Sequence, residues 1–157
     1  YKRQYMGFPC ENRDEKFINA SESEKPKLEK VIGIDDIPMD FDTMAQCGSM
    51  AGSGGVIVMD DSRDMAWILN NINTINAHAS CGQCTPCREG THWARLIVQD
   101  FLKGNGNERK MKRLHRVGGN MMGTTVCALG DAAAMPITSF VTKFPEEFEK
   151  YYTQAAA

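Results

Sequence analysis

The sequence lacks the features that would direct it to a membrane, to nucleic acid or to hydrolysis. It has no run of about 18 apolar residues, so no segment is expected to span a bilayer. Its net charge of -2 and its pI near 5.9 provide no basic footprint for DNA or RNA. No nucleophile–base pair or carboxylate pair stands out. We therefore expect no nucleic-acid partner, and contact with a membrane only through other proteins.

A glycine-rich stretch, residues 48–55, lacks the features of a phosphate-binding loop. A Walker loop needs Lys and then Ser or Thr after its last glycine, whereas Val56 and Ile57 stand there. A dinucleotide-binding loop follows a strand and opens a helix, whereas this stretch precedes the apolar residues 56–59. We therefore favour a structural turn that leads into one short strand over a nucleotide site.

Three regions follow from the composition along the chain of 157 residues. Residues 1–36 are rich in charge and poor in large apolar side chains, which predicts an extended arm or linker. Residues 37–60 contain a short helix that opens near Asp40, and then the strand. Residues 61–153 show helical spacing of apolar residues. The predicted fold class is mainly α: a helical bundle with a short β fragment and an extended N-terminal arm.

Helices of the third region are predicted from caps and apolar faces. Residues 60–62 would cap a first helix that ends near Ala79, with one face formed by Met65, Ile68, Leu69, Ile72 and Ile75. A second helix is expected to start after Cys87 and to stop at residues 104–106, with one face formed by Trp93, Leu96, Ile97 and Phe101.

The rest of the third region predicts three more helices. Residues 108–120 are expected to form a basic helix with Met111, Leu114 and Val117 inside. Its five basic residues could meet an acidic partner, but a solvated helix face is the favoured interpretation. Asp131 is expected to cap a further helix, which Pro136 should bend or whose start it should shift. A last short helix begins near Pro145.

Four of the six cysteines form one pattern, which predicts a metal centre. Cys81, Cys84 and Cys87 share one short loop, and Cys127 follows after a long gap. Four thiolates in such a run are typical of an iron–sulfur cluster. Structural zinc remains the alternative, although zinc sites usually take their cysteines as two pairs. Cys10 and Cys47 lie outside the pattern and are interpreted as ordinary thiols.

Two residues beside the cysteines predict how the site is tuned. Gly82 lets the backbone approach closely, so that loop N–H groups could bond to sulfur. Arg88 is the nearest positive charge in sequence, and we predict that it raises the reduction potential.

The residues around the cysteines resemble a known family. Ser80 to Gly90, together with Cys127 to Ala134, is similar to the NADH-binding flavoprotein subunit of respiratory complex I, the 51 kDa subunit of mitochondria. The resemblance extends from about Ile37 to Tyr151. That family usually has Glu before the Ser-Cys-Gly, where this chain has Ala79. The family's flavin loop and its NADH-contacting acidic residues have no counterpart here.

This resemblance implies a cofactor set and a function. Cys81, Cys84, Cys87 and Cys127 would hold a 4Fe–4S cluster that receives electrons from FMN and passes them toward quinone. FMN and NADH would lie on a partner chain, with Ala128 and Leu129 as neighbours of the FMN. The resemblance leaves two explanations for the missing flavin part, a split subunit, which we favour, or a reduced relative. It further implies partners in the large (75 kDa-type) and small (24 kDa-type) iron–sulfur subunits. Residues 37–60 would then be the end of a β-grasp domain.

Two alternatives and a location accompany that expectation. The same loop occurs in the diaphorase part of NAD-linked hydrogenases and formate dehydrogenases, so that role stays open. A zinc-bound or metal-free assembly module is the alternative of another class. The family implies a place in the peripheral arm, on the matrix side of the mitochondrial inner membrane or the cytoplasmic side of a bacterial membrane. Part of an NADH:ubiquinone reductase is therefore the favoured interpretation.

Overall fold

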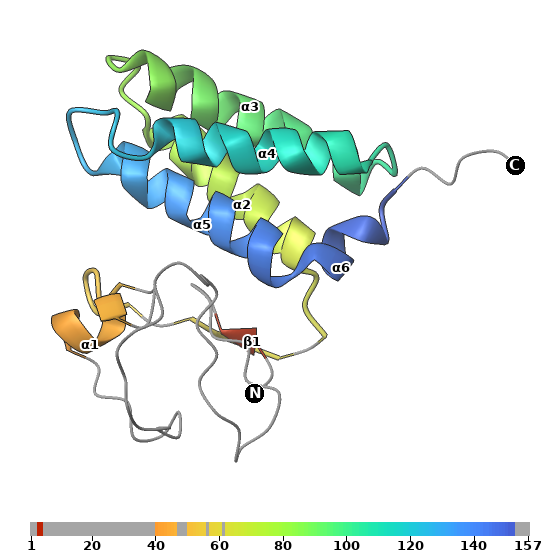
Figure 1. The fold of residues 1–157 in the computed structure, drawn as a ribbon, viewed down its shortest axis with the longest axis horizontal. Helices are drawn as coiled ribbons and strands as arrows, with labels where there is room; N and C mark the ends of the chain where they lie inside the picture. Colours follow the sequence, from red (N-terminus) through yellow and green to blue (C-terminus); the bar gives the residue numbers. More distant parts are fainter. Residues whose placement is uncertain (1–2, 5–39, 47–49, 56, 61, 153–157) are drawn as a thin grey trace, which may run out of the picture. The chain divides into compact units, whose positions relative to one another are not determined.

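The computed structural model describes residues 3–4, 40–46, 50–55, 57–60 and 62–152 (Figure 1). The chain divides into two compact units, residues 1–63 and residues 64–157. Nearly all of the predicted arm, and both Cys10 and Cys47, lie outside the described residues. The predicted boundaries of the arm and of the β-grasp remnant stay predictions.

The described residues of the first unit include two very short strands and one short helix, on either side of the glycine-rich turn in the sequence. Strand β1 (Arg3–Gln4) pairs antiparallel with β2 (Val58–Met59), and Arg3 lies opposite Met59. Helix α1 (Phe41–Gln46) begins directly after Asp40, as predicted. The turn closes with a hydrogen bond of 2.9 Å from Gly54 N–H to the Ala51 carbonyl. The strand predicted over residues 56–59 forms at its last two residues.

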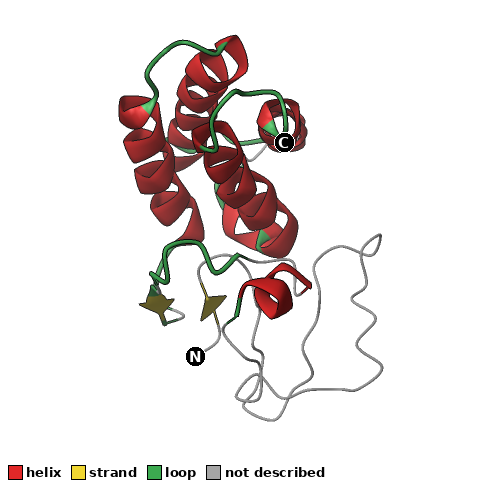
Figure 2. Ribbon diagram, turned by 90° about the vertical axis from the view of Figure 1, so that its left-hand side faces the viewer, coloured by secondary structure: helices red, strands yellow, loops and turns green. Residues whose placement is uncertain are grey.

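In the second unit, residues 64–152 form a bundle of four long helices and a short fifth helix. Figures 1 and 2 show how these helices pack, with the short helix at one end. The long helices are α2 (Met65–Ala79), α3 (Thr85–Leu102), α4 (Glu108–Met121) and α5 (Leu129–Lys143). Each packs against the next, and α5 returns to α2. Helix α6 (Pro145–Glu149) contacts α2 and α5. The prediction of a mainly α fold is confirmed, and no described helix is long and apolar enough to cross a membrane.

The core of the bundle is formed by large side chains that all four long helices and α6 contribute. Burying each such side chain stabilises the fold by roughly 1.5–3 kcal/mol. The largest completely covered apolar side chains include Leu69, Phe101, Leu114, Ile137, Phe140 and Phe148. The inner face predicted for the basic helix is confirmed, because Met111, Leu114 and Val117 of α4 are all buried.

The cap predicted for α2 was wrong by a few residues. Asp64 is the N-cap, and its carboxylate accepts a hydrogen bond of 2.9 Å from Trp67 N–H. Asp60 cannot serve because its carboxylate is engaged in its own turn, where it accepts 2.6 Å from the Ser62 hydroxyl. The predicted apolar face also extends too far, since Ile75 is 67% exposed.

The face predicted for α3 was wrong as well. Trp93 and Leu96 are 53% and 45% exposed, whereas Phe101 is completely buried. The inner side of α3 is formed by smaller residues, among them Ala94 and Val98. These let α3 approach its neighbours closely, and Trp93 and Leu96 are left on a second apolar face.

Two prolines, Pro136 in α5 and Pro145 in α6, lie in different helical positions. Pro136 is buried inside α5, and the helix continues past it to Lys143. Because proline has no N–H, it leaves the Ala132 carbonyl without its usual helical partner. Pro145 stands at the first turn of α6, as predicted, where a missing N–H costs nothing.

Candidate metal centre

Three of the four candidate cysteines lie where α2 gives way to α3. Helix α2 ends at Ala79, and α3 begins at Thr85 rather than after Cys87, which corrects the prediction. Proline is favoured in a first helical turn, so Pro86 allows the earlier start. Cys81 is therefore on the loop, Cys84 is the N-cap residue, and Cys87 is inside the first turn. Cys81 is exposed, whereas Cys87 is buried.

The loop between these helices is folded back by a glycine and an arginine. Gly82 has φ of 81°, a left-handed conformation that disfavours any side chain. Arg88 Nη1 donates a hydrogen bond of 2.7 Å to the Gly82 carbonyl, and Arg88 Nε lies 2.9 Å from a Glu89 carboxylate oxygen. Arg88 thus ties the loop to α3, and Glu89 offsets part of its charge. Its predicted effect on the potential stays a prediction.

Ser80 places a hydroxyl beside a candidate ligand. Its Oγ lies 3.4 Å from Cys87 Sγ, and it accepts a hydrogen bond of 3.4 Å from Gly82 N–H. Because the Gly82 N–H already supplies a proton to this oxygen, the Ser80 hydroxyl proton is free to point at the sulfur. A thiolate at Cys87 would accept that hydrogen bond.

The fourth cysteine lies on the loop between α4 and α5. Asp131 was predicted to cap α5, but the helix begins at Leu129 and has no side-chain cap. The Asp131 carboxylate instead accepts a hydrogen bond of 2.6 Å from Gly123 N–H, which fastens the start of the loop to the first turn of α5. A Cβ at Gly130 would collide with the Thr125 side chain, so only glycine lets the loop pass there.

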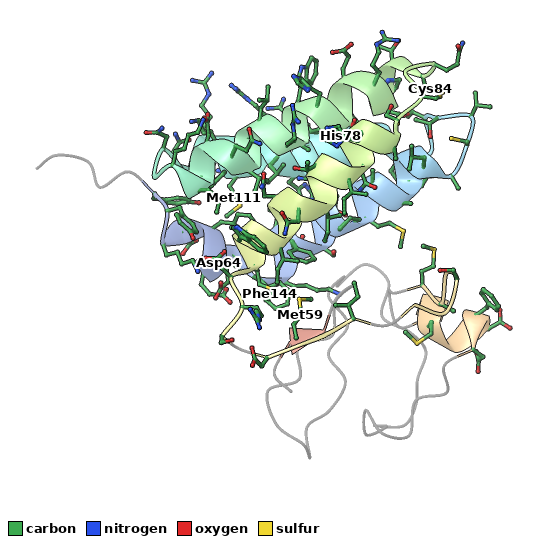
Figure 3. The ribbon with its side chains drawn as sticks, turned by 180° about the vertical axis from the view of Figure 1, so that it is seen from behind. Met59, Asp64, His78, Cys84, Met111 and Phe144 are labelled. Atoms are coloured by element: carbon green, nitrogen blue, oxygen red, sulfur yellow. The ribbon has the colours of Figure 1, made fainter. Side chains whose placement is uncertain are left out.

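One contact brings the two cysteine loops together. Val126 N–H donates a hydrogen bond of 3.5 Å to Cys84 Sγ, although the two residues are far apart in sequence. Val126 directly precedes Cys127, whose carbonyl accepts 3.0 Å from the Thr125 hydroxyl. Cys127 is exposed beside this contact. The loops that carry all four candidate ligands therefore meet at one end of the bundle, where Figure 3 places Cys84.

The donor set fits an iron–sulfur cluster or zinc in its chemistry. Four cysteines can supply four thiolates, which are the ligands that both groups favour. The side chains have not converged on a single point: no three His, Cys, Asp or Glu of the described residues form a metal-holding group. A backbone contact between the two loops is formed, from Val126 N–H to Cys84 Sγ.

Other residues near the site divide into those that the sequence indicated and those that it did not. Ala128 is exposed at the start of α5, and Leu129 is half-buried there. Their predicted proximity to FMN stays a prediction. Sequence reasoning missed the hydroxyl of Ser80 and the anchoring role of Asp131. Only the first had a signal, since Ser80 directly precedes the cysteine loop.

Comparison with known proteins gives a consistent result. Residues 67–151 match the family described as the NADH-ubiquinone oxidoreductase-F iron-sulfur binding region. The chain is 41% identical over 134 residues to the F subunit of NADH-quinone oxidoreductase from Rickettsia massiliae (strain Mtu5), which covers 85% of this chain and 31% of that protein. With the same protein of Rickettsia felis (strain ATCC VR-1525 / URRWXCal2), identity is 43% over 115 residues, 73% of this chain and 27% of the relative. The chain spans roughly a third of these relatives.

Solved structures show the same fold. The NAD+-reducing NiFe-hydrogenase in the H2-reduced state superposes with a TM-score of 0.61 at 28% identity, over 66% of this chain and 18% of that one. The air-oxidised state gives a TM-score of 0.59 at 24% identity, over 86% of this chain and 21% of that one. The second likeness supports the fold alone.

Proposed function

The chain belongs to the family of the NADH-ubiquinone oxidoreductase-F iron-sulfur binding region, and we propose that it binds one 4Fe–4S cluster for electron transfer in an NADH dehydrogenase complex. The proposed ligands are Cys81, Cys84, Cys87 and Cys127. The observation that carries the proposal is the 3.5 Å contact between Val126 N–H and Cys84 Sγ, because it joins the fourth-ligand loop to the other three.

Residues of this chain have three roles in the proposal. The cysteines hold the cluster, which when bound accepts and releases one electron at a time. Arg88 and Asp131 keep the two loops in place through the Gly82 carbonyl and the Gly123 N–H. Ser80 and the Val126 N–H place hydrogen-bond donors beside ligand sulfurs, where they would favour the more negative, reduced state.

The relatives support a proposal for the wider role of the chain. In the proposal, FMN and NADH are bound by a partner chain, with Ala128 and Leu129 facing the flavin, and electrons pass on toward quinone through the large (75 kDa-type) and small (24 kDa-type) iron–sulfur subunits of complex I. The similar proteins of Rickettsia are F subunits of NADH-quinone oxidoreductase. The proposed location is the peripheral arm, on the mitochondrial matrix side or the cytoplasmic side of a bacterial membrane.

A second candidate is the diaphorase part of an NAD-linked hydrogenase or formate dehydrogenase. The likeness to the NAD+-reducing NiFe-hydrogenase supports it. Both candidates use the same cluster, and only the partner chains differ. Mass spectrometry of the purified assembly separates them, because complex I would supply quinone-directed subunits and the alternative a hydrogenase or formate dehydrogenase subunit.

The decisive test of the centre is to purify the protein anaerobically, to measure iron, acid-labile sulfide and zinc per chain, and to record the visible spectrum. About four iron and four sulfide per chain support the proposal. About one zinc without sulfide would replace it with a structural or assembly module. A pair of variants tests the fourth ligand. The variant Cys127→Ala should lose most of the iron, whereas the matched control Cys47→Ala, which lies outside the four-cysteine pattern, should keep it. Equal iron in both variants would contradict the assignment of Cys127.

A further inference from the structure

The outer side of α3 and α4 carries a surface hollow that the fold does not need. It has a volume of about 550 Å³ and lies between the two helices, which pack side by side in Figure 1. Trp93, Leu96 and Ile97 of α3 line it together with Val117 of α4. Two charged residues of α4, Arg113 and Arg116, complete its wall. The hollow thus combines an apolar floor with a positive edge.

Only part of the apolar floor belongs to the core: Val117 is a core residue, whereas Trp93 and Leu96 lie outside the core. The core is closed by the opposite side of α3, where Ala94, Val98 and Phe101 are completely covered. Trp93 and Leu96 nevertheless remain about half exposed and adjacent to each other across one helical turn. Contiguous exposed apolar residues with a polar rim mark interaction sites more often than isolated ones do. Covering them would stabilise a complex through the same burial that stabilises the core.

The two arginines at the hollow differ in their ion pairing from the two lysines of α4. Lys110 pairs with Asp100 at 2.7 Å, and Lys112 pairs with Glu108 at 2.6 Å. Within the part of the chain that the structure describes, Arg113 and Arg116 have no carboxylate partner. The positive charge that faces the hollow is therefore uncompensated, whereas Lys110 and Lys112 on the same helix are paired with carboxylates of this chain. A ligand with carboxylates would supply the missing charge.

We propose that this hollow docks an acidic segment of a partner protein, which seats an apolar side chain against Trp93 and Leu96 and places carboxylates at Arg113 and Arg116. Tryptophan and arginine are the residue types that most often dominate protein–protein binding energy, and a guanidinium can hold a carboxylate through two hydrogen bonds. None of the residues that line the hollow is a candidate ligand, so the proposal goes beyond electron transfer and does not depend on which group the cysteines hold.

The test uses the assembled complex, purified through a tag on this chain, with Arg113→Lys or Arg116→Lys in place. Each variant keeps the charge and introduces an amine that a zero-length carbodiimide can couple to a carboxylate within salt-bridge distance. Mass spectrometry should find the introduced amine joined to Asp or Glu of another protein, in a segment that also contains large apolar residues. Native Lys112 is the internal control, since its coupling should join it to Glu108 of this chain.

Several results would overturn the proposal. Coupling to this chain's own carboxylates would mean that the hollow is covered from within, and coupling to a second copy would make it a homodimer contact. The absence of any coupling to a partner at either position would mean that no acidic segment is there.

A charge reversal gives the second measurement. Arg113→Glu combined with Arg116→Glu should weaken association with the cross-linked partner by at least about tenfold. Lys112→Glu, on the same helix but away from the hollow, should change it by less than about twofold. Iron and sulfide per chain should stay unchanged in both, so a failure of docking is distinguishable from a failure of the proposed centre. Equal binding by the two charge variants would contradict the inference.

Discussion

The two ends of the helical bundle differ in what holds them closed. At the end where α2 begins, Asp64 accepts hydrogen bonds from Trp67 N–H at 2.9 Å and from the Tyr151 hydroxyl at 2.6 Å. Lys150 Nζ lies 2.7 Å from the same carboxylate. Beneath these contacts, the rings of Phe101 and Phe148 meet edge to face at 5.7 Å. This end, which Figure 3 marks with Asp64, is closed entirely by side chains of the protein.

The cysteine end is closed less completely. Neither α3 nor α5 has a side-chain cap at its first turn. The loops are fastened to their own helices by Arg88 and Asp131, and they contact each other through the weak N–H···S hydrogen bond from Val126 to Cys84. Val126 itself is 94% exposed. The comparison indicates that contacts within the protein close one end of the bundle more completely than the other.

The largest expected loss of stability comes from a substitution at the end of the bundle where α2 begins. Phe148→Ala removes a completely buried ring and should lower the free energy of unfolding by about 3–5 kcal/mol, measured by chemical denaturation. Iron per folded chain should stay constant, because the cysteine loops are at the other end. Val126→Ala is the matched control: an exposed side chain lost at the cysteine end should cost less than about 0.5 kcal/mol. Similar losses in the two variants would refute the difference between the ends.

The second expected effect is a rise in hydrogen exchange that is confined to the cysteine end of the bundle. Anaerobic removal of iron and sulfide should raise hydrogen exchange of the amides in residues 81–87 and 122–128 by about a hundredfold, which corresponds to about 2.7 kcal/mol. Amides in residues 64–67 and 148–152 should change little, since protein side chains close that end. A uniform rise along the bundle would show instead that both ends depend on the bound group.

The third effect separates the charge of Asp64 from its capping role. Asp64→Ala should cost about 1–2 kcal/mol at pH 7 through loss of the N-cap and its partners. Asp64→Asn keeps a capping oxygen but no charge, so it should cost less.

The pH dependence of the Asp64 variants follows from the carboxyl group. Burial raises the pKa of Asp64, but hydrogen bonds from Lys150, Tyr151 and the Trp67 N–H outweigh it and bring the pKa below its usual 3.8. A lowered pKa in the folded state contributes stability above the unfolded value, and that stability is lost as the pH falls through the folded value. The gap between the native chain and Asp64→Asn should therefore narrow below about pH 4. A constant gap from pH 7 to pH 3 would contradict this explanation.

The sequence predicted single-faced helices well and two-faced helices poorly. Helix α4 has one apolar face, so the spacing of Met111, Leu114 and Val117 sufficed to identify its buried side. Helix α3 has two apolar faces, and periodicity alone could not tell that Ala94 and Val98 point inward while Trp93 points outward. The buried side of such a helix depends on how closely its neighbours approach, which is a property of the tertiary structure.

The candidate site shows the same limit. Cysteine spacing selected four thiols as candidate ligands, and their role as ligands stays a prediction. The partners of Asp131 and Ser80 depend on how the two loops fold back on their helices. Asp131 looked like a helix cap, yet it bonds to Gly123 across the loop. Likewise, several acidic residues stand before α2, and only the turn formed by Asp60 and Ser62 excludes Asp60 as the cap.

The smallest expected effect is a shift in reduction potential, which tests whether residues at the cysteine end adjust the potential of a bound cluster. Ser80→Ala removes the hydroxyl 3.4 Å from Cys87 Sγ and should leave the loop otherwise intact, because Arg88 still holds the Gly82 carbonyl. A hydrogen bond to a ligand sulfur stabilises the reduced state, so its loss should lower the midpoint potential. If that hydrogen bond contributes about 0.5–1.5 kcal/mol, the shift is about 20–60 mV for one electron.

The measurement is a redox titration followed by electron paramagnetic resonance, with iron content checked first. Ser80→Thr keeps the hydroxyl and should titrate close to the native chain, which separates hydrogen bonding from a change in packing. Arg88→Ala is a weaker test, because Arg88 supplies both a charge and the hydrogen bond that folds the loop. An unchanged potential in Ser80→Ala would mean that the hydroxyl does not reach the sulfur once the cluster is bound. The cysteine end would then hold the group without tuning it through Ser80, and the N–H of Val126 would be the next donor to test.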